Sequence, residues 1–180
     1  MEKEFITYGH IIDPEKFMEI KDSPEFEYIQ KPKGGLWCSP VDSDWGWKDW
    51  CLSENFMVNH LSIWTKFTLL PGTKILIIDS FKDLLQVGKE FGEIKDYGYG
   101  KKCIIRFTKI RESGYHGVFL TTCGNFQCHL PMYSNPDFDI DLNAWDCESM
   151  VLFDLAQIKI TEKYGKEEDI KKQILPPEIV

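Results

Sequence analysis

The feature that most limits the fold of this chain is the length of its apolar segments. Apolar and β-prone residues occur in runs of about four to eight residues, and most runs end at Gly, Pro, Asp or Ser. Short runs bounded by such turn residues are typical of β-strands. No run approaches the ~18 residues that a membrane span requires, so we expect no membrane partner.

The apolar runs predict strands along most of the chain. These strands cover residues 4–9, 36–38, 62–69, 74–79, 118–120 and 147–153, and residues 157–160 continue the last one. Pro71 and Gly72 form a turn signal between two of them, which predicts a hairpin of 62–69 with 74–79.

Helices are predicted where capping residues precede apolar periodicity. Asp13-Pro14-Glu15 opens one, Ser43 or Asp44 caps a second that reaches Glu54, and Ser80 with Asp83 caps a third that ends near Gly92. Residues 88–101 and 131–143 are predicted loops, and residues 103–111 fit either a helix or a strand.

This order of elements indicates an α+β protein with one or two mostly antiparallel sheets. A chain of 180 residues suits one core. We therefore expect a single domain over residues 1–163 and a charged C-terminal tail over 164–180.

Charge and cysteine usage narrow the possible partners and surroundings. The net charge of −8 repels phosphate backbones, which favours a protein over a nucleic acid as partner. The six cysteines have irregular spacing and the N-terminus lacks a leader pattern, so we expect reduced thiols in a cytoplasmic protein. Cys123, Cys128 and His129 lack a second ligand pair, so no metal site is predicted.

Tryptophans are unusually frequent, with six in the chain. Trp37, Trp45, Trp47 and Trp50 lie close together, as in a core or an aromatic-walled pocket. The spacing of Trp47, Trp50 and Cys51 predicts that they share the buried face of a helix, while Trp37, after two glycines, is expected to border a cleft.

Four short segments combine residues of chemical interest. They are Tyr8-Gly9-His10, the segment from Lys33 to Ser39, the segment from Gly114 to Val118, and the segment from Trp145 to Asp154. Each alone suits an ordinary turn or strand end. Their order and spacing together resemble the ADP-ribosyltransferase superfamily, most closely where Glu148 precedes an apolar strand that runs into Phe153-Asp154 and Gln157-Ile158.

This resemblance implies a split β-sheet core with flanking helices that grips NAD. It assigns Glu148 to the stabilisation of the oxocarbenium ion that forms when nicotinamide leaves, and His10 to the orientation of a ribose. Trp37 would stack on nicotinamide, and Ser39 would bond its carboxamide or steady Glu148. The amides of Gly34 and Gly35, with Lys33, would meet the pyrophosphate.

The implied function is that of an NAD-dependent mono-ADP-ribosyltransferase or NAD glycohydrolase with an unknown acceptor. Trp37 replaces the usual Tyr and His116 the common Asp, so a non-catalytic member that binds a nucleotide or a protein stays open. The sequence is also compatible with a cysteine hydrolase that pairs Cys38 with His10, His60 or His116, and with a pure interaction module.

Overall fold

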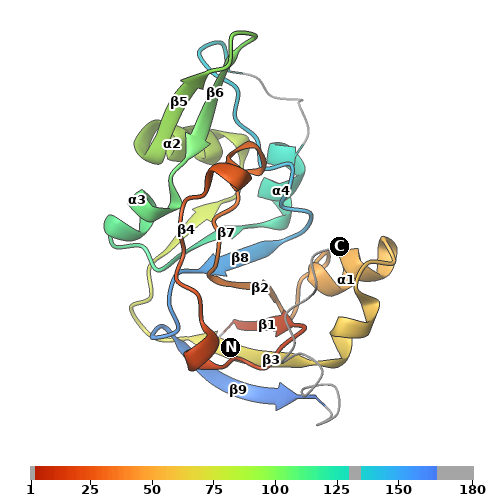
Figure 1. Ribbon diagram of the computed structural model, residues 1–180. Coiled ribbons are helices and arrows are strands. Elements are labelled where there is room, and N and C mark those ends of the chain that lie inside the picture. The colour runs from red at the N-terminus through yellow and green to blue at the C-terminus, as the bar shows by residue number, and fades with distance from the viewer. Residues whose placement is uncertain (1–2, 130–134, 166–180) are drawn as a thin grey trace.

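A seven-stranded sheet forms the centre of the computed structural model, which describes residues 3–129 and 135–165 (Figure 1). The strand order is β4-β7-β8-β2-β1-β3-β9. The strands are β1 (Glu4–Tyr8), β2 (Leu36–Pro40), β3 (Trp64–Leu69), β4 (Ile75–Ile78), β7 (Gly117–Leu120), β8 (Ser149–Leu152) and β9 (Ile158–Tyr164). All neighbours are antiparallel except β4 and β7.

Helices and a second small sheet surround this core, which confirms the α+β class. The α-helices are α1 (Trp47–Ser53), α2 (Phe81–Phe91), α3 (Phe107–Glu112) and α4 (Thr122–His129). The 3-10 helices are η1 (Pro14–Lys16), η2 (Pro24–Ile29) and η3 (Val58–Ser62), and β5 (Gly92–Asp96) pairs with β6 (Lys101–Ile105). In Figure 1, α2, α3 and α4 lie beside the β4-β7-β8 half, and α1 lies beside the other half.

The sheet bends sharply at β2. Leu36, Trp37 and Cys38 of this strand pair with β8, whereas Ser39 and Pro40 pair with β1. In a flat sheet β1 and β7 would lie about 14 Å apart, because neighbouring strands are about 4.8 Å apart. The rings of Phe5 and Phe119 on these strands nevertheless meet edge to face at 6.2 Å.

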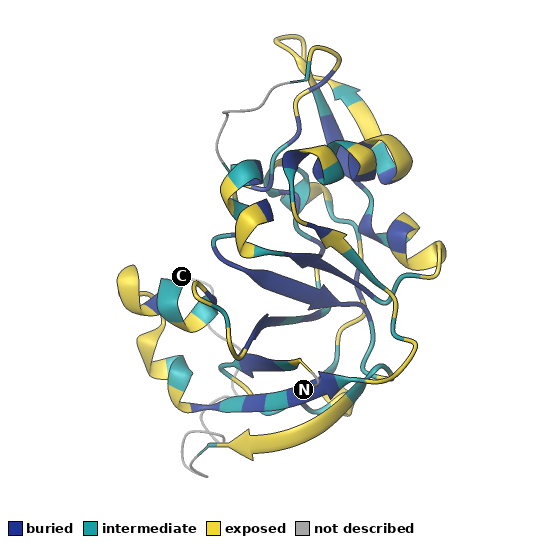
Figure 2. Cartoon of the chain, turned by 180° about the vertical axis from the view of Figure 1, so that it is seen from behind, coloured by how far each residue is buried: buried dark blue, intermediate teal, exposed yellow. Residues whose placement is uncertain are grey.

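Two hydrophobic cores follow from this bend. One lies between α2, α3 and α4 and the β4-β7-β8 half, and includes Leu84, Ile110 and Val118. The other fills the inside of the bend, and includes Phe67, Met150 and Leu152. Strand β8 belongs to both cores and is buried along its length, whereas β9 at the sheet edge is mostly exposed (Figure 2).

The predicted cap of α2 is confirmed. The Ser80 hydroxyl accepts a hydrogen bond from the Asp83 amide at 3.3 Å and donates one to the Asp83 carboxylate at 2.7 Å. Phe81, Leu84 and Phe91 are buried on the inner face as expected, and the helix ends at Gly92.

The predicted hairpin of β3 with β4 is wrong. Strand β3 pairs with β1 on one side and with β9 on the other, so neither edge is open to β4. The chain turns at Gly72, where φ is +86°, and crosses to the far edge, where β4 pairs in parallel with β7.

The loop predicted over 88–101 is confirmed only for residues 97–100, which connect β5 to β6. Gly88 lies within α2 and does not interrupt it. A Cβ there would lie 2.7 Å from Ile140 and 3.2 Å from the Cys103 sulfur, so the glycine permits close packing. The chain continues directly into β5, and the ambiguous segment 103–111 contains both the end of β6 and α3.

Four further elements differ from the predictions. The helix predicted from Asp13 is only the single turn η1, although Asp13 does cap it by accepting from the Glu15 amide. Helix α1 begins after Gly46 rather than after Ser43 or Asp44. Helix α4 falls where no helix is predicted, and β9 extends past residue 163 to Tyr164. The rest of the predicted tail, 166–180, lies outside the described residues, as do residues 130–134 of the predicted loop 131–143.

Within the described part of the chain, no helix combines the length and the hydrophobicity needed to cross a membrane.

Candidate functional site

A cavity of about 320 Å³, here called the central cavity, opens where the sheet bends. Its walls come from the end of β1, from β2 at its change of partner, and from the segment that enters β8. The lining residues are Ile6, Thr7, Tyr8, His10, Lys31, Trp37, Cys38, Ser39, Trp47, Trp145, Asp146, Cys147 and Ser149. His10, from the first motif, and Trp37 and Ser39, from the second, therefore line one site.

Ser39 ties three segments of this site together. Its buried hydroxyl donates to the Glu148 carbonyl oxygen at 2.8 Å and accepts from the Trp47 amide at 2.9 Å. The residue thus holds β2 against both the start of β8 and the first turn of α1. The contact is to the backbone of Glu148 and not to its carboxylate.

Aromatic rings form much of the cavity wall. The Trp37 and Trp145 rings meet at a steep angle, 4.7 Å between centroids, and the Trp145 indole donates to the Gln30 carbonyl oxygen at 3.0 Å. On the other side Trp47 stacks on Trp50 at 5.0 Å. The prediction that Trp47, Trp50 and Cys51 share a buried face is confirmed in part: Cys51 is buried, whereas the two tryptophans are only partly buried because α1 lies at the rim of the sheet.

Two charged side chains reach the cavity. The Lys31 ammonium lies 3.8 Å from the Asp146 carboxylate and 5.4 Å from the centroid of the Trp37 ring. Burial lowers the pKa of Lys31, and the neighbouring Asp146 carboxylate opposes this shift. The pair supplies one cation and one anion against an aromatic wall.

His10 follows β1 and lies at the mouth of the cavity. The side chain is solvent-accessible, yet partial desolvation by the surrounding protein lowers the pKa of its imidazole, and a backbone hydrogen bond with Tyr8 opposes this effect. The ring is therefore mostly neutral near pH 7 and offers both a donor and an acceptor.

Glu148 belongs to the same segment, but its side chain is not among those that line the central cavity. Cys147 and Ser149, on either side of it, do line the cavity. The structure thus brings His10, Trp37 and Ser39 together without the Glu148 carboxylate, and places Asp146 there instead.

The two glycines before β2 have a packing role. A Cβ on Gly34 would lie 2.5 Å from the Glu19 carbonyl oxygen, and one on Gly35 would lie 2.7 Å from Val151. The Gly35 amide already donates to the Met18 carbonyl oxygen at 2.9 Å, so it is not free to meet a pyrophosphate, contrary to expectation. Neither glycine lines the central cavity.

A second groove begins where the central cavity ends. This side groove, of about 680 Å³, shares His10 with the central cavity and includes Ile11, Lys16, Phe17, Gly35 and Lys163. The two hollows together offer an elongated ligand one path past His10.

A cysteine hydrolase does not fit this geometry. Cys38 is buried, its thiol donates to the Met150 carbonyl oxygen at 3.6 Å, and burial raises its pKa far above the ordinary value. Burial also raises the pKa of Cys147 to about 11. His116 lies elsewhere, where its Nδ1 accepts from the Lys74 amide.

All six cysteines are free thiols, and Cys123 alone is exposed. No cluster of three His, Cys, Asp or Glu side chains placed to hold a metal occurs in residues 3–129 and 135–165.

Most residues of the cavity wall have no role in the resemblance, which assigns roles only to His10, Trp37 and Ser39 among them. Trp145, Asp146 and Cys147 stand directly before Glu148, yet the resemblance assigns a role to Glu148 alone, and it assigns none to Lys31. Strand alternation does not separate Asp146 from Glu148, because residues two apart share a face in an extended strand, so only the folded structure distinguishes the two carboxylates. No family model, no curated protein and no solved structure significantly matches this chain.

Proposed function

We propose that this chain binds NAD in the central cavity and cleaves it as an ADP-ribosyltransferase or NAD glycohydrolase does. The supporting observation is that His10 of the first motif lines one cavity at the bend of the sheet together with Trp37 and Ser39 of the second motif. A sheet divided at β2 also suits the split core of the superfamily that the motifs resemble.

The cavity walls suit the parts of a dinucleotide. Trp37 and Trp47 offer flat apolar surfaces for a heterocyclic ring. The Lys31 ammonium supplies the positive charge for a phosphate, the role expected of Lys33 and the glycine amides. The largely neutral His10 sits between the central cavity and the side groove, where it can exchange hydrogen bonds with a ribose.

The reaction needs a carboxylate beside the ribose. The bond between ribose C1′ and the nicotinamide nitrogen breaks, its electron pair leaves with nicotinamide, and the positive charge left on the ribose is stabilised by an anion. Water or an acceptor then bonds to C1′ and releases a proton. Because Asp146 lines the cavity and Glu148 does not, we assign this role to Asp146.

The test is the rate of nicotinamide release at saturating NAD for Asp146→Asn, Glu148→Gln and the wild type. Asp146→Asn should reduce turnover by about 10²–10³-fold, the scale for loss of one electrostatic stabiliser. Glu148→Gln should stay within a few-fold of wild type. Glu90→Gln, an exposed residue on α2, serves as the control for a generic loss of one negative charge.

If only Glu148→Gln is inactive, the catalytic carboxylate is that of Glu148, as the motif indicates, and the assignment to Asp146 is wrong. A second candidate function is NAD or nucleotide binding without turnover, which the position of Glu148 away from the cavity favours. Saturable NAD binding by a wild type that releases no nicotinamide would establish that candidate.

A further inference from the structure

Aromatic side chains gather around α1, and this group is here called the aromatic ridge. Trp47 stacks on Trp50, and the Phe56 ring meets these two rings at steep angles, 6.1 and 5.3 Å between centroids. Trp45 and Phe126 line a hollow of about 320 Å³ between α1 and α4, together with Trp50. Among the residues that the structure describes, neither hydrophobic core includes any of these five rings.

Much of the aromatic ridge is open to solvent. Phe126 is 61% exposed, Phe56 44% and Trp45 37%. Every residue from 52 to 59, at the end of α1 and after it, is exposed as well (Figure 2). Large apolar side chains that gather on the surface, with polar groups around them, are typical of an interaction site.

The turn after α1 holds Phe56 on the aromatic ridge. Asn55 and Met57, on either side of it, have φ values of 51° and 45°, a left-handed conformation that residues other than glycine rarely adopt. The Phe56 amide donates to the Cys51 carbonyl oxygen at 2.9 Å. Such backbone strain costs stability and is concentrated at functional sites, and here it places an aromatic ring on the surface rather than in a core.

The segment that carries four of the five rings is acidic. Residues 42–58 contain Asp42, Asp44, Asp49 and Glu54, and their only Lys or Arg is Lys48. Within the described part of the chain none of these four carboxylates forms an ion pair, whereas those around the β5–β6 hairpin do. The aromatic ridge therefore lies beside negative charge that is free to meet a basic partner.

We propose that the aromatic ridge is a docking surface for a basic amphipathic helix of another protein. The apolar face of such a helix would cover the rings, and one of its large side chains would enter the hollow between α1 and α4. Basic side chains beside that apolar face would meet the carboxylates of residues 42–54. No step of NAD chemistry is involved, so this inference does not rest on the proposed function.

Charge favours this occupant over three others. A second copy of the chain would bring two acidic segments together, and each copy has a net charge of −8. An anionic membrane surface attracts basic rather than acidic segments. Residues 166–180 of this chain contain more acidic than basic side chains, so they match the ridge poorly.

The probe is the synthetic peptide acetyl-LKKLLKLLKKLLKL-amide, which as a helix is apolar on one face and basic on the other. The indole N–H signals of Trp45 and Trp50, assigned with Trp45→Phe and Trp50→Phe, are followed by NMR without NAD. They should shift to saturation with a dissociation constant on the order of 10 μM. A peptide of the same composition, in an order that gives no apolar helical face, should bind at least about 10-fold more weakly. The analogue with Glu in place of every Lys should not saturate.

Matched variants locate the bound peptide. Phe126→Ala removes an exposed ring of the ridge and should weaken binding by about 10-fold. Tyr99→Ala removes a ring that is 92% exposed on the β5–β6 hairpin and should leave the affinity unchanged. Glu54→Gln should weaken binding by about 3-fold and reduce its dependence on salt, whereas Glu90→Gln on α2 should do neither.

Equal affinity of the reordered peptide, or equal effects of Phe126→Ala and Tyr99→Ala, would overturn the proposal. So would the absence of saturable binding to the full chain, the result expected if residues 166–180 themselves cover the ridge. Sedimentation of the chain alone as a dimer that Phe126→Ala dissociates would identify a second copy as the occupant instead. Binding to phosphatidylserine vesicles that Phe126→Ala abolishes would identify a membrane surface.

Discussion

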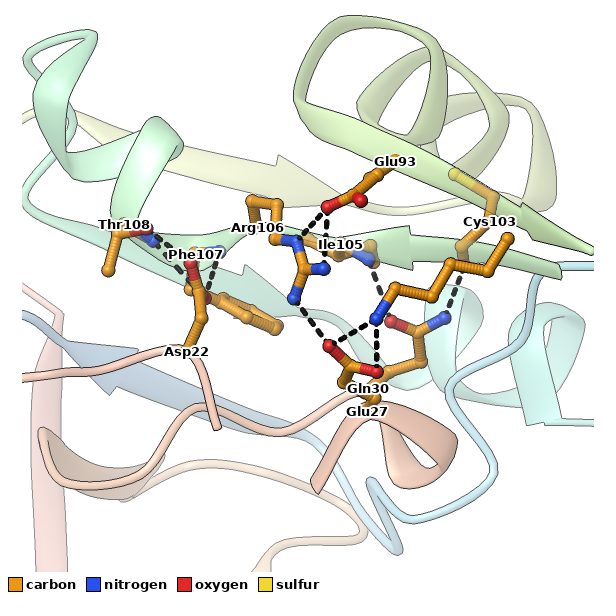
Figure 3. A network of polar contacts seen from close by, with 10 residues as sticks. Asp22, Glu27, Gln30, Glu93, Cys103, Ile105, Arg106, Phe107 and Thr108 are labelled. Carbon is orange, nitrogen blue, oxygen red and sulfur yellow. Dashed lines mark hydrogen bonds and ion pairs between the residues drawn. The ribbon is translucent and has the colours of Figure 1, made fainter. Parts of the chain in front are cut away.

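At the scale of single residues, Gln30 has the most unusual environment in the described chain. It is buried and adopts a left-handed backbone conformation, with φ at 53°, which is uncommon for a residue other than glycine. Its side-chain amide donates to the Cys103 carbonyl oxygen at 2.6 Å and accepts from the Ile105 amide at 2.9 Å (Figure 3). Its own carbonyl oxygen accepts from the Trp145 indole.

Gln30 therefore connects β6 to the wall of the central cavity. The backbone turn that its left-handed conformation makes leads directly into Lys31, which lines the cavity. Gln30 thus holds part of the cavity wall in place, although it does not itself line the cavity.

The Gln30→Ala variant should lose about 2–4 kcal/mol of unfolding free energy, because it leaves a buried carbonyl and a buried amide without their partner. Gln86→Ala, at an exposed position on α2, is the matched control and should stay within about 0.5 kcal/mol of wild type. Urea unfolding measures both. Similar values for the two variants would show that the Gln30 contacts contribute little.

At the scale of elements, a polar network attaches η2 to the β5–β6 hairpin and to α3 (Figure 3). Glu27 on η2 receives the Lys95 ammonium at 2.7 Å and the Arg106 guanidinium at 2.8 Å, and Arg106 also binds Glu93. Asp22, just before η2, accepts from the Phe107 amide at 2.9 Å at the start of α3. These charged contacts thus fix the position of residues 22–27, which lead to Lys31 in the cavity wall.

This network predicts a dependence of stability on pH. Hydrogen bonds from Lys95, and then contacts with Arg106, hold the pKa of Glu27 below its ordinary value, and partial burial opposes them. A lowered pKa in the folded state contributes stability that is present above the unfolded pKa, about 4.3, and is lost as the pH falls through the folded pKa.

Glu27→Gln should therefore reduce stability at pH 7 and flatten its decline between about pH 5 and pH 3. Urea unfolding at several pH values gives both curves. Glu90→Gln is the control, because Glu90 is exposed and should leave the slope unchanged. A Glu27→Gln curve that runs parallel to that of wild type would rule out this coupling.

The elements that the sequence predicts well are those whose signals are local. The cap of α2 depends on Ser80 and Asp83, three residues apart, and the strands around Ile6, Phe67 and Val151 depend on short apolar runs. The pairing of β4 cannot be predicted from the Pro71-Gly72 turn. That turn is a local signal, whereas β1 and β9, which pair with the two edges of β3, come from distant parts of the sequence.

The candidate site is predicted in part for the same reason. His10, Trp37 and Ser39 stand at strand ends that the motifs mark, and they do line one cavity. The motif assigns the carboxylate to Glu148 rather than Asp146 because the sequence does not show that the chain bends at residues 147–148, just before β8. Helix α4 escapes prediction because Gly124 within it resembles a breaker, although that glycine lies against the Ile78 carbonyl and permits close packing.

At the scale of the whole molecule, the bend at β2 is what makes a site possible. It turns the β1-β3-β9 half toward the β4-β7-β8 half, so that Phe5 meets Phe119 inside while the cavity opens at the change of partner. The side groove shares His10 with this cavity, and a hollow between α1 and α4 shares Asp146 with it.

The central claim is that the cavity at this bend binds NAD. Calorimetric titration of NAD into the wild type and Trp37→Ala tests it most directly, with Tyr99→Ala, at the exposed tip of the β5–β6 hairpin, as the aromatic control. The wild type and Tyr99→Ala should bind with equal dissociation constants on the order of 1 mM or tighter, and Trp37→Ala should bind at least about 10-fold more weakly because it loses a stacking surface. Absence of saturable binding to the wild type, or equal affinity of Trp37→Ala, would contradict the claim.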